Sequence, residues 1–65
     1  MDELITRLVA EYKADAITWH DIQDQVTAYI MLHDGKGMSF ETDVIKDRFN
    51  KANEILEKIE SKLRG

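Results

Sequence analysis

The chain has 65 residues, of which 43% are hydrophobic and 34% charged, a composition that is typical of globular proteins and excludes a disordered chain. It contains no cysteine, which excludes disulfides and thiolate metal sites. The net charge is −4, with seven acids against three bases in residues 1–40, and this excess of acids disfavours a nucleic-acid partner because phosphate binding depends on Lys and Arg.

The first predicted helix covers residues 2–14. Asp2 and Glu3 lie in its first turn, where negative charge interacts favourably with the helix dipole. Its apolar residues recur at intervals of three and four, as on one face of a helix: they are Leu4, Ile5, Leu8, Val9 and Tyr12.

A start signal precedes the second predicted helix, residues 19–33. Thr18 is placed to cap this helix, and Asp21 occupies the position that completes a capping box. Ile17 and Ile22 have the spacing of a hydrophobic staple. These local signals predict that a new helix begins at residue 19.

The third predicted helix runs from residue 40 to residue 64 and is the longest. The second helix ends before Asp34-Gly35, where a glycine suits a left-handed C-cap, and Ser39 is the expected N-cap of the third helix. An apolar seam follows the third helix at heptad spacing; its members are Ile45, Phe49, Ala52, Leu56, Ile59 and Leu63. Such a seam indicates that the helix associates with another helix of similar length.

The first half of the chain leaves a second arrangement open. Residues 2–33 also hold heptad spacing, with no Gly or Pro between residues 14 and 18, and can therefore form one straight helix of a two-helix hairpin. In that case Asp15 would lie on the apolar seam, and the capping signals at Thr18 would be coincidental. We therefore favour an all-α fold of three helices, with the long C-terminal helix organising one domain over residues 1–65.

Several features favour a soluble, cytoplasmic protein that associates with itself. No stretch approaches the about 20 apolar residues of a membrane span, and the start, Met1-Asp2-Glu3, is acidic where a secretory signal would be basic. A chain this short rarely gains more than ~3–5 kcal/mol from its own core, and small domains usually add disulfides, a metal or a second subunit. Without cysteine, a second subunit is the addition that the composition leaves open.

Surplus apolar surface supports the same expectation. Residues 29–32 point in four directions around the second helix, and one neighbouring helix cannot cover them all. Val44 and Ile55 flank the seam of the third helix. We therefore expect a two-fold dimeric helical bundle. Its expected protein-binding surface consists of Tyr29, Met31, Leu32, Val44, Arg48, Lys51, Ile55, Lys58 and Lys62.

The third helix also carries charged side chains in regular positions. Three pairs place an acid four residues before a base, each stabilising the helix by ~0.2–0.5 kcal/mol: Asp47–Lys51, Glu54–Lys58 and Glu60–Arg64. One flank is basic, and we refer to it as the basic flank: Arg48, Lys51, Lys58 and Lys62. This flank supplies the alternative function, a small regulator that binds nucleic acid.

No constellation in the sequence predicts catalysis, a metal or a cofactor. His20 and Asp24 share a helix face, but a divalent ion needs three or four converging ligands. The turn at residues 34–37 has the composition of the middle of a calcium-binding loop. If Asp34 is aligned with the third position of such a loop, Leu32 and Lys36 fall at the first and fifth positions, where oxygen ligands are required. We therefore expect a non-enzymatic protein–protein interaction module, in the style of a regulator, adaptor or inhibitor. Its expected partners are itself and a protein that the sequence does not identify.

Overall fold

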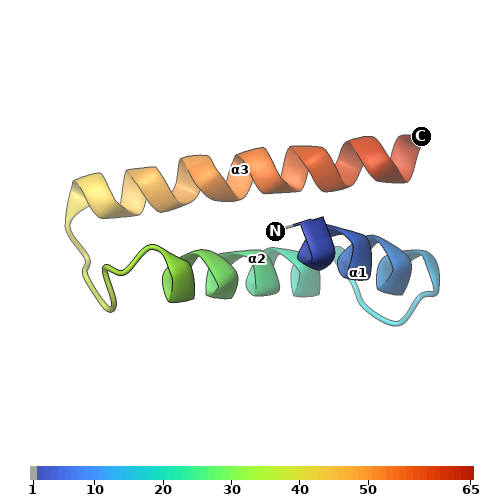
Figure 1. Ribbon diagram of the computed structural model, residues 1–65, viewed down its shortest axis with the longest axis horizontal. Coiled ribbons are helices and arrows are strands. Elements are labelled where there is room, and N and C mark those ends of the chain that lie inside the picture. Colours follow the sequence, from blue (N-terminus) through green and yellow to red (C-terminus); the bar gives the residue numbers. More distant parts are fainter. Residues whose placement is uncertain (1) are drawn as a thin grey trace.

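The computed structural model describes residues 2–65 and contains three helices, α1 (Asp2–Lys13), α2 (Trp19–His33) and α3 (Thr42–Arg64). The predicted all-α fold with a long C-terminal helix is confirmed. Helix α3 lies along one side of the molecule, and α1 and α2 lie along the other (Figure 1). Residues 2–65 therefore form two layers of helices, in a molecule that measures 36 × 19 × 19 Å.

Helices α1 and α2 are separate because the chain turns sharply at Asp15. The φ angle of this residue is 58°, in the left-handed region through which a right-handed helix does not continue. The Ala16 N–H donates to the Glu11 carbonyl at 2.9 Å, and the Asp15 N–H donates to the Tyr12 carbonyl at 3.1 Å. This pair of bonds is the Schellman pattern of a helix end, with Asp15 where a glycine is most common. One straight helix over residues 2–33 is therefore excluded.

The predicted capping box at the start of α2 is confirmed. The Asp21 N–H donates to the Thr18 hydroxyl oxygen at 3.2 Å, and the Thr18 N–H donates to the Asp21 carboxylate at 2.9 Å. The bond from the Thr18 N–H, and after it a bond that the Thr18 hydroxyl donates to the same carboxylate at 3.1 Å, lower the pKa of the Asp21 carboxyl. Ile22 is fully buried and Ile17 packs against the core that contains it, as the predicted staple requires.

The connection from α2 to α3 begins as predicted from the sequence, but it ends at a different residue. Gly35 has a φ of 72°, the left-handed conformation predicted after the end of α2. The prediction that Ser39 caps α3 is wrong, because α3 begins at Thr42 after Glu41, whose side chain makes no capping bond. The Ser39 hydroxyl instead accepts a hydrogen bond from the Glu41 N–H at 3.4 Å, within the loop. Residues 40 and 41 therefore belong to the loop.

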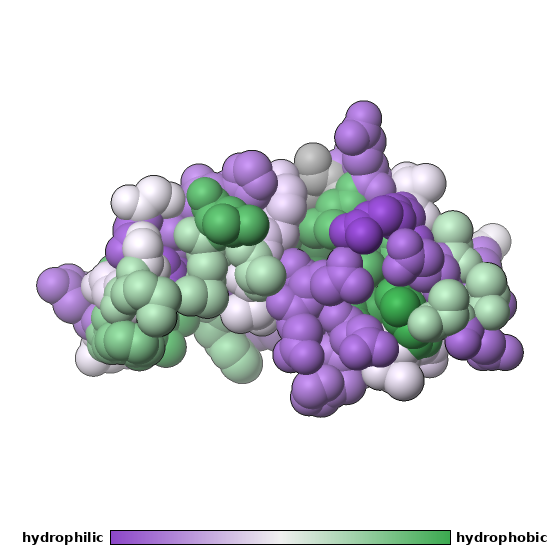
Figure 2. All heavy atoms as spheres, turned by 90° about the horizontal axis from the view of Figure 1, so that it is seen from below, coloured by the Kyte–Doolittle hydropathy of each residue, from purple (hydrophilic) through white to green (hydrophobic). Residues whose placement is uncertain are grey.

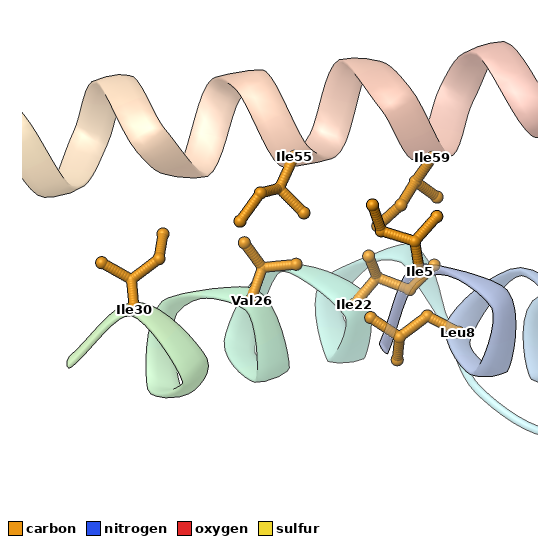
Figure 3. Close-up of a cluster of buried hydrophobic side chains, with 7 residues drawn as sticks. All are labelled: Ile5, Leu8, Ile22, Val26, Ile30, Ile55 and Ile59. Atoms are coloured by element: carbon orange, nitrogen blue, oxygen red, sulfur yellow. The ribbon is translucent and has the colours of Figure 1, made fainter. Parts of the chain in front are cut away.

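One hydrophobic core joins the three helices (Figure 3). Ile55 and Ile59 point from α3 toward side chains of the other two helices. The core members are at most 5% exposed and are Ile5, Leu8, Ile22, Val26, Ile30, Ile55 and Ile59. Burial of this apolar surface is the main force that holds α3 against α1 and α2.

The heptad seam of α3 divides into two parts. Its C-terminal part, Leu56, Ile59 and Leu63, lies in or against the core, whereas Ile45 and Phe49 are 50% and 66% exposed. Helix α1 lies beneath only the C-terminal part of α3 (Figure 1). The N-terminal part of α3 therefore packs on α2 alone, and one helix cannot cover the whole apolar face opposite it.

Candidate functional site

Large exposed apolar side chains gather at the end of the molecule where α2 connects to α3. Figure 2 shows hydrophobic side chains at that end, on the left. We refer to these side chains as the apolar end: Leu32 (80% exposed), Met38 (72%), Phe40 (77%), Ile45 (50%) and Phe49 (66%). Among the described residues, one further large apolar side chain is exposed, Tyr12, at 36%. The exposed apolar surface is therefore concentrated in one half of the protein.

The sequence predicted only one member of the apolar end, Leu32, as a binding residue. The exposure of Met38 was indicated by the sequence, since Met38 follows Gly35 and Gly37 in a connecting segment, and loops run over the surface of a protein. Phe40 was predicted as the first residue of the third helix, and the structure places it in the loop. The exposure of Phe49 had no such signal, because its heptad position is equally compatible with a buried side chain.

Two shallow cavities border the contact between α2 and α3. One has a volume of about 280 Å³ and is lined by Tyr29, Ile30, His33, Asp34, Lys51, Glu54 and Ile55. The other has a volume of about 250 Å³, and we call it the Phe49 groove; it is lined by Thr27, Ile30, Ile45, Arg48, Phe49 and Ala52. Because Thr27 and Tyr29 lie about 160° apart around α2, the cavities open on opposite sides of the helix pair.

Arg48, which lines the Phe49 groove, forms an ion pair with Asp34. Arg48 of α3 donates to the Asp34 carboxylate at the end of α2, from Nε to Oδ2 at 2.6 Å and from Nη2 to Oδ1 at 3.2 Å. The same Nη2 also donates to the Gly37 carbonyl at 2.6 Å. The Arg48 guanidinium and, after it, the Lys36 N–H hold the pKa of Asp34 at about 2. The two side chains are only 13% and 3% exposed, so Arg48 serves an internal contact.

Two other residues of the predicted binding surface are covered by the chain itself. Val44 is 9% exposed and Ile55 is 4% exposed. Ile55 lies on the face of α3 that packs on α2, and the eleven positions between it and Val44 are about three helical turns, so both share that face. The expectation that these two side chains contact another subunit is therefore corrected.

The remaining predicted residues are spread over both helices. Tyr29 and Met31 are half-buried and Leu32 is exposed on α2, while Lys51, Lys58 and Lys62 are exposed on α3. The structure brings Tyr29 and Lys51 together, along with Ile55, around the cavity opposite the Phe49 groove. The Tyr29 ring also lies against the His33 ring, with centroids 4.2 Å apart.

Acids neutralise part of the basic flank. Lys51 Nζ lies 3.0 Å from the Asp47 carboxylate, and the hydrogen bond from Lys51 lowers the pKa of Asp47. This pair and Glu60–Arg64, at 3.6 Å, confirm two of the three predicted acid–base pairs. The third pair, Glu54–Lys58, is not among the ion pairs of the described residues.

His20 and Asp24 lie on one face of α2 as predicted, with Nδ1 and Oδ2 3.3 Å apart. Both side chains are well exposed, at 80% and 69%. Within residues 2–65, no three His, Asp or Glu side chains converge as metal ligands would. In the same part of the chain, none of the helices combines the length and hydrophobicity that crossing a bilayer requires.

Comparison with known proteins identifies no relative. No protein-family model matches the chain, and no match was found among curated proteins or among solved structures. We therefore infer function from the geometry of the chain itself.

Proposed function

We propose that this chain is a non-enzymatic protein–protein interaction module that associates with itself through the apolar end. The observation that supports the proposal is the exposure of Leu32, Met38, Phe40, Ile45 and Phe49 at one end of the molecule. Soluble monomers rarely expose large contiguous apolar patches, and such patches mark sites where a protein binds a partner.

The small size of the protein supports self-association in particular. Its core joins three helices through seven well-buried side chains, and a core of this size rarely supplies more than ~3–5 kcal/mol. A second subunit that covers the apolar end removes further apolar surface from water and adds to this stability. In cells the protein would act as a small regulator, adaptor or inhibitor. We propose the cytoplasm as its compartment, because a chain without cysteine requires no oxidising environment.

The alternative function, nucleic-acid binding through the basic flank, has less support. Arg48 is held by Asp34, and Lys51 lies beside Asp47. Each pairing removes a charge that would otherwise be available to a phosphate group. We expect no retention on a DNA column at low salt; retention that is lost in Lys58→Glu would favour the alternative.

The first test is the absolute mass in solution, measured by light scattering from about 1 µM to about 1 mM, a range that covers moderate and weak complexes. We expect the mass to rise with concentration toward twice the 7.6 kDa of one chain. A mass that stays near 7.6 kDa at every concentration would refute self-association.

A further inference from the structure

We infer that the Phe49 groove is the dimer interface, and that its occupant is a second copy of this chain, which seats its own Phe49 in the groove under two-fold symmetry. This inference rests on the proposed function, since it names the surface and the partner of the self-association. Three observations support it: the shape of the face, the continuity of the heptad seam, and the charge of the groove.

The face presents a protruding side chain and a cavity side by side. Phe49 is 66% exposed and Ile45 is 50% exposed, and both border a groove of about 250 Å³ between α2 and α3. A two-fold interface uses the same surface on both subunits, so that surface must be complementary to itself. An aromatic side chain beside a groove meets this requirement, because each copy can place its ring in the cavity of the other.

The heptad seam continues from the core of the protein into this face. Leu56, Ile59 and Leu63 contact the core, and the same spacing leads without interruption to Phe49 and Ile45. Residues at heptad spacing pack into holes formed by a facing helix. In the N-terminal half of α3, helix α2 leaves Ile45 and Phe49 exposed, so a helix that covers these two side chains has to come from another molecule. If two copies contact each other through this half of α3, helices α2 and α3 of one copy and α2 and α3 of the other form a four-helix arrangement.

The groove is electrically neutral although the protein is acidic. A chain with a net charge of −4 repels its own copies, so they can approach closely only at a surface without excess negative charge. Arg48 is the one charged residue that lines the groove, and Asp34 neutralises it. A partner of opposite charge would be recognised by a charged surface; a neutral groove instead suits a partner of the same charge.

The polar lining of the groove tolerates burial. The Thr27 hydroxyl already donates to the Gln23 carbonyl at 2.9 Å, so covering it leaves no unsatisfied donor. The cavity on the opposite side is lined by Lys51 and Glu54, whose charges would lose their hydration in an interface. The Phe49 groove is thus the side of the helix pair on which an apolar contact costs less desolvation.

The first experiment compares Phe49→Asp with the matched control Asn50→Asp by light scattering. Both side chains are exposed and each change adds one negative charge to α3, so neither should unfold the chain, which circular dichroism verifies. Asn50 lies about 160° from Ala52 around α3 and therefore outside the groove. We expect Phe49→Asp to weaken self-association at least about tenfold, as loss of a central aromatic contact does, and Asn50→Asp to leave it unchanged. Wild-type association in Phe49→Asp, or its loss in Asn50→Asp alone, would overturn the inference.

The second experiment maps the contact between copies. Because the protein has no cysteine, Asn53→Cys carries a single nitroxide one turn beyond Phe49, and this labelled chain is mixed with ¹⁵N-labelled wild type. We expect the nitroxide to broaden the amide signals of Thr27, Ile45 and Ala52 in the other copy.

The possible failures are distinguishable. A mass near 7.6 kDa at every concentration refutes the self-association and the inference together. A dimer in which broadening is confined to residues outside the groove, such as Leu32 and Met38, overturns the inference and leaves the proposed self-association intact.

Discussion

At the scale of single residues, Arg48 and Asp34 make the contact that shapes the connection between α2 and α3. The guanidinium binds the carboxylate through two nitrogens and the Gly37 carbonyl through one of them. It therefore joins the end of α2, the loop and the first turns of α3. Since both side chains are largely hidden from solvent, removal of either partner leaves the other charge poorly hydrated.

This ion pair makes stability depend on pH in the acidic range. The pKa of Asp34 is about 2 in the folded chain against 3.8 ordinarily, so folding favours the ionised form. The resulting stability is complete above about pH 4 and is lost as the pH falls through about 2. We expect wild type to melt several degrees above Asp34→Asn near neutral pH, and this gap to close toward about pH 2. Thermal denaturation followed by circular dichroism at a series of pH values measures the gap.

The control is Glu57→Gln, on an exposed part of α3 outside the ion pairs of the described residues. It should melt close to wild type near neutral pH. A gap between wild type and Asp34→Asn that stays constant down to pH 2 would show that the ion pair does not control acid stability. Asp21 and Asp47 also have lowered pKa values, so Asp34→Asn should retain part of the acid sensitivity.

At the scale of the elements, local hydrogen bonds decide where the first two helices end and begin. Asp15 closes α1 through the Schellman bonds, and Thr18 opens α2 through the capping box. Both motifs satisfy backbone groups that have no partner within the helix. Together they turn the chain back within residues 14–18, so that α1 and α2 can lie on the same side of α3.

We expect Thr18→Ala to destabilise the protein by about 1 kcal/mol, the usual cost of a lost N-cap. The reason is that the alanine side chain cannot accept the bond from the Asp21 N–H, which the hydroxyl accepts at 3.2 Å. Urea denaturation measures the loss as a lower midpoint with an unchanged slope. Thr18→Ser retains the hydroxyl and should lie within a few tenths of a kcal/mol of wild type. Equal midpoints for Ala and Ser would show that the cap adds nothing to stability.

At the scale of the whole molecule, the C-terminal part of the α3 seam stabilises the fold, and the N-terminal part lies at the proposed interface. The C-terminal part lies in the core that α1 and α2 supply, while the N-terminal part faces outward beside the Phe49 groove. One helix with one continuous pattern therefore contributes both to folding and to the proposed association.

The same substitution in each part separates the two roles. Ile59 is fully buried, and Ile59→Ala should remove ~2–5 kcal/mol, most of what a core of this size supplies. Ile45 is 50% exposed, so Ile45→Ala should leave the folding of the monomer nearly unchanged and weaken self-association. Thermal melts at low protein concentration report folding of the monomer, and sedimentation at high concentration reports association. Equal loss of monomer stability in both variants would contradict the division of the seam.

Much of the fold was predictable because its signals are local. The capping box, the glycine after α2 and the apolar periodicity each involve residues within about one or two turns, so they act before tertiary contacts form. The start of α3 was not predictable in this way. Ser39 has a suitable side chain, but Arg48 ties the preceding loop to Asp34 and Gly37, and the helix starts only at Thr42.

The candidate site was less predictable than the fold. Val44 and Ile55 have the same chemistry as Ile45 and Phe49, and all four lie on α3 at helical spacing. Which pair is buried depends on where α2 and α1 lie around that helix. The structure buries the first pair and exposes the second.

The sequence by itself determined that the chain is helical, that a capping box stands before residue 19, and that apolar residues recur at heptad spacing along the long C-terminal helix. These properties follow from side-chain chemistry and from spacing along the chain. Only the tertiary structure decided that α1 covers the C-terminal part of α3, so that the unpaired apolar surface lies beside the Phe49 groove. The reason is that burial depends on which helix lies opposite a residue, and the periodicity of one helix does not specify the position of its neighbours.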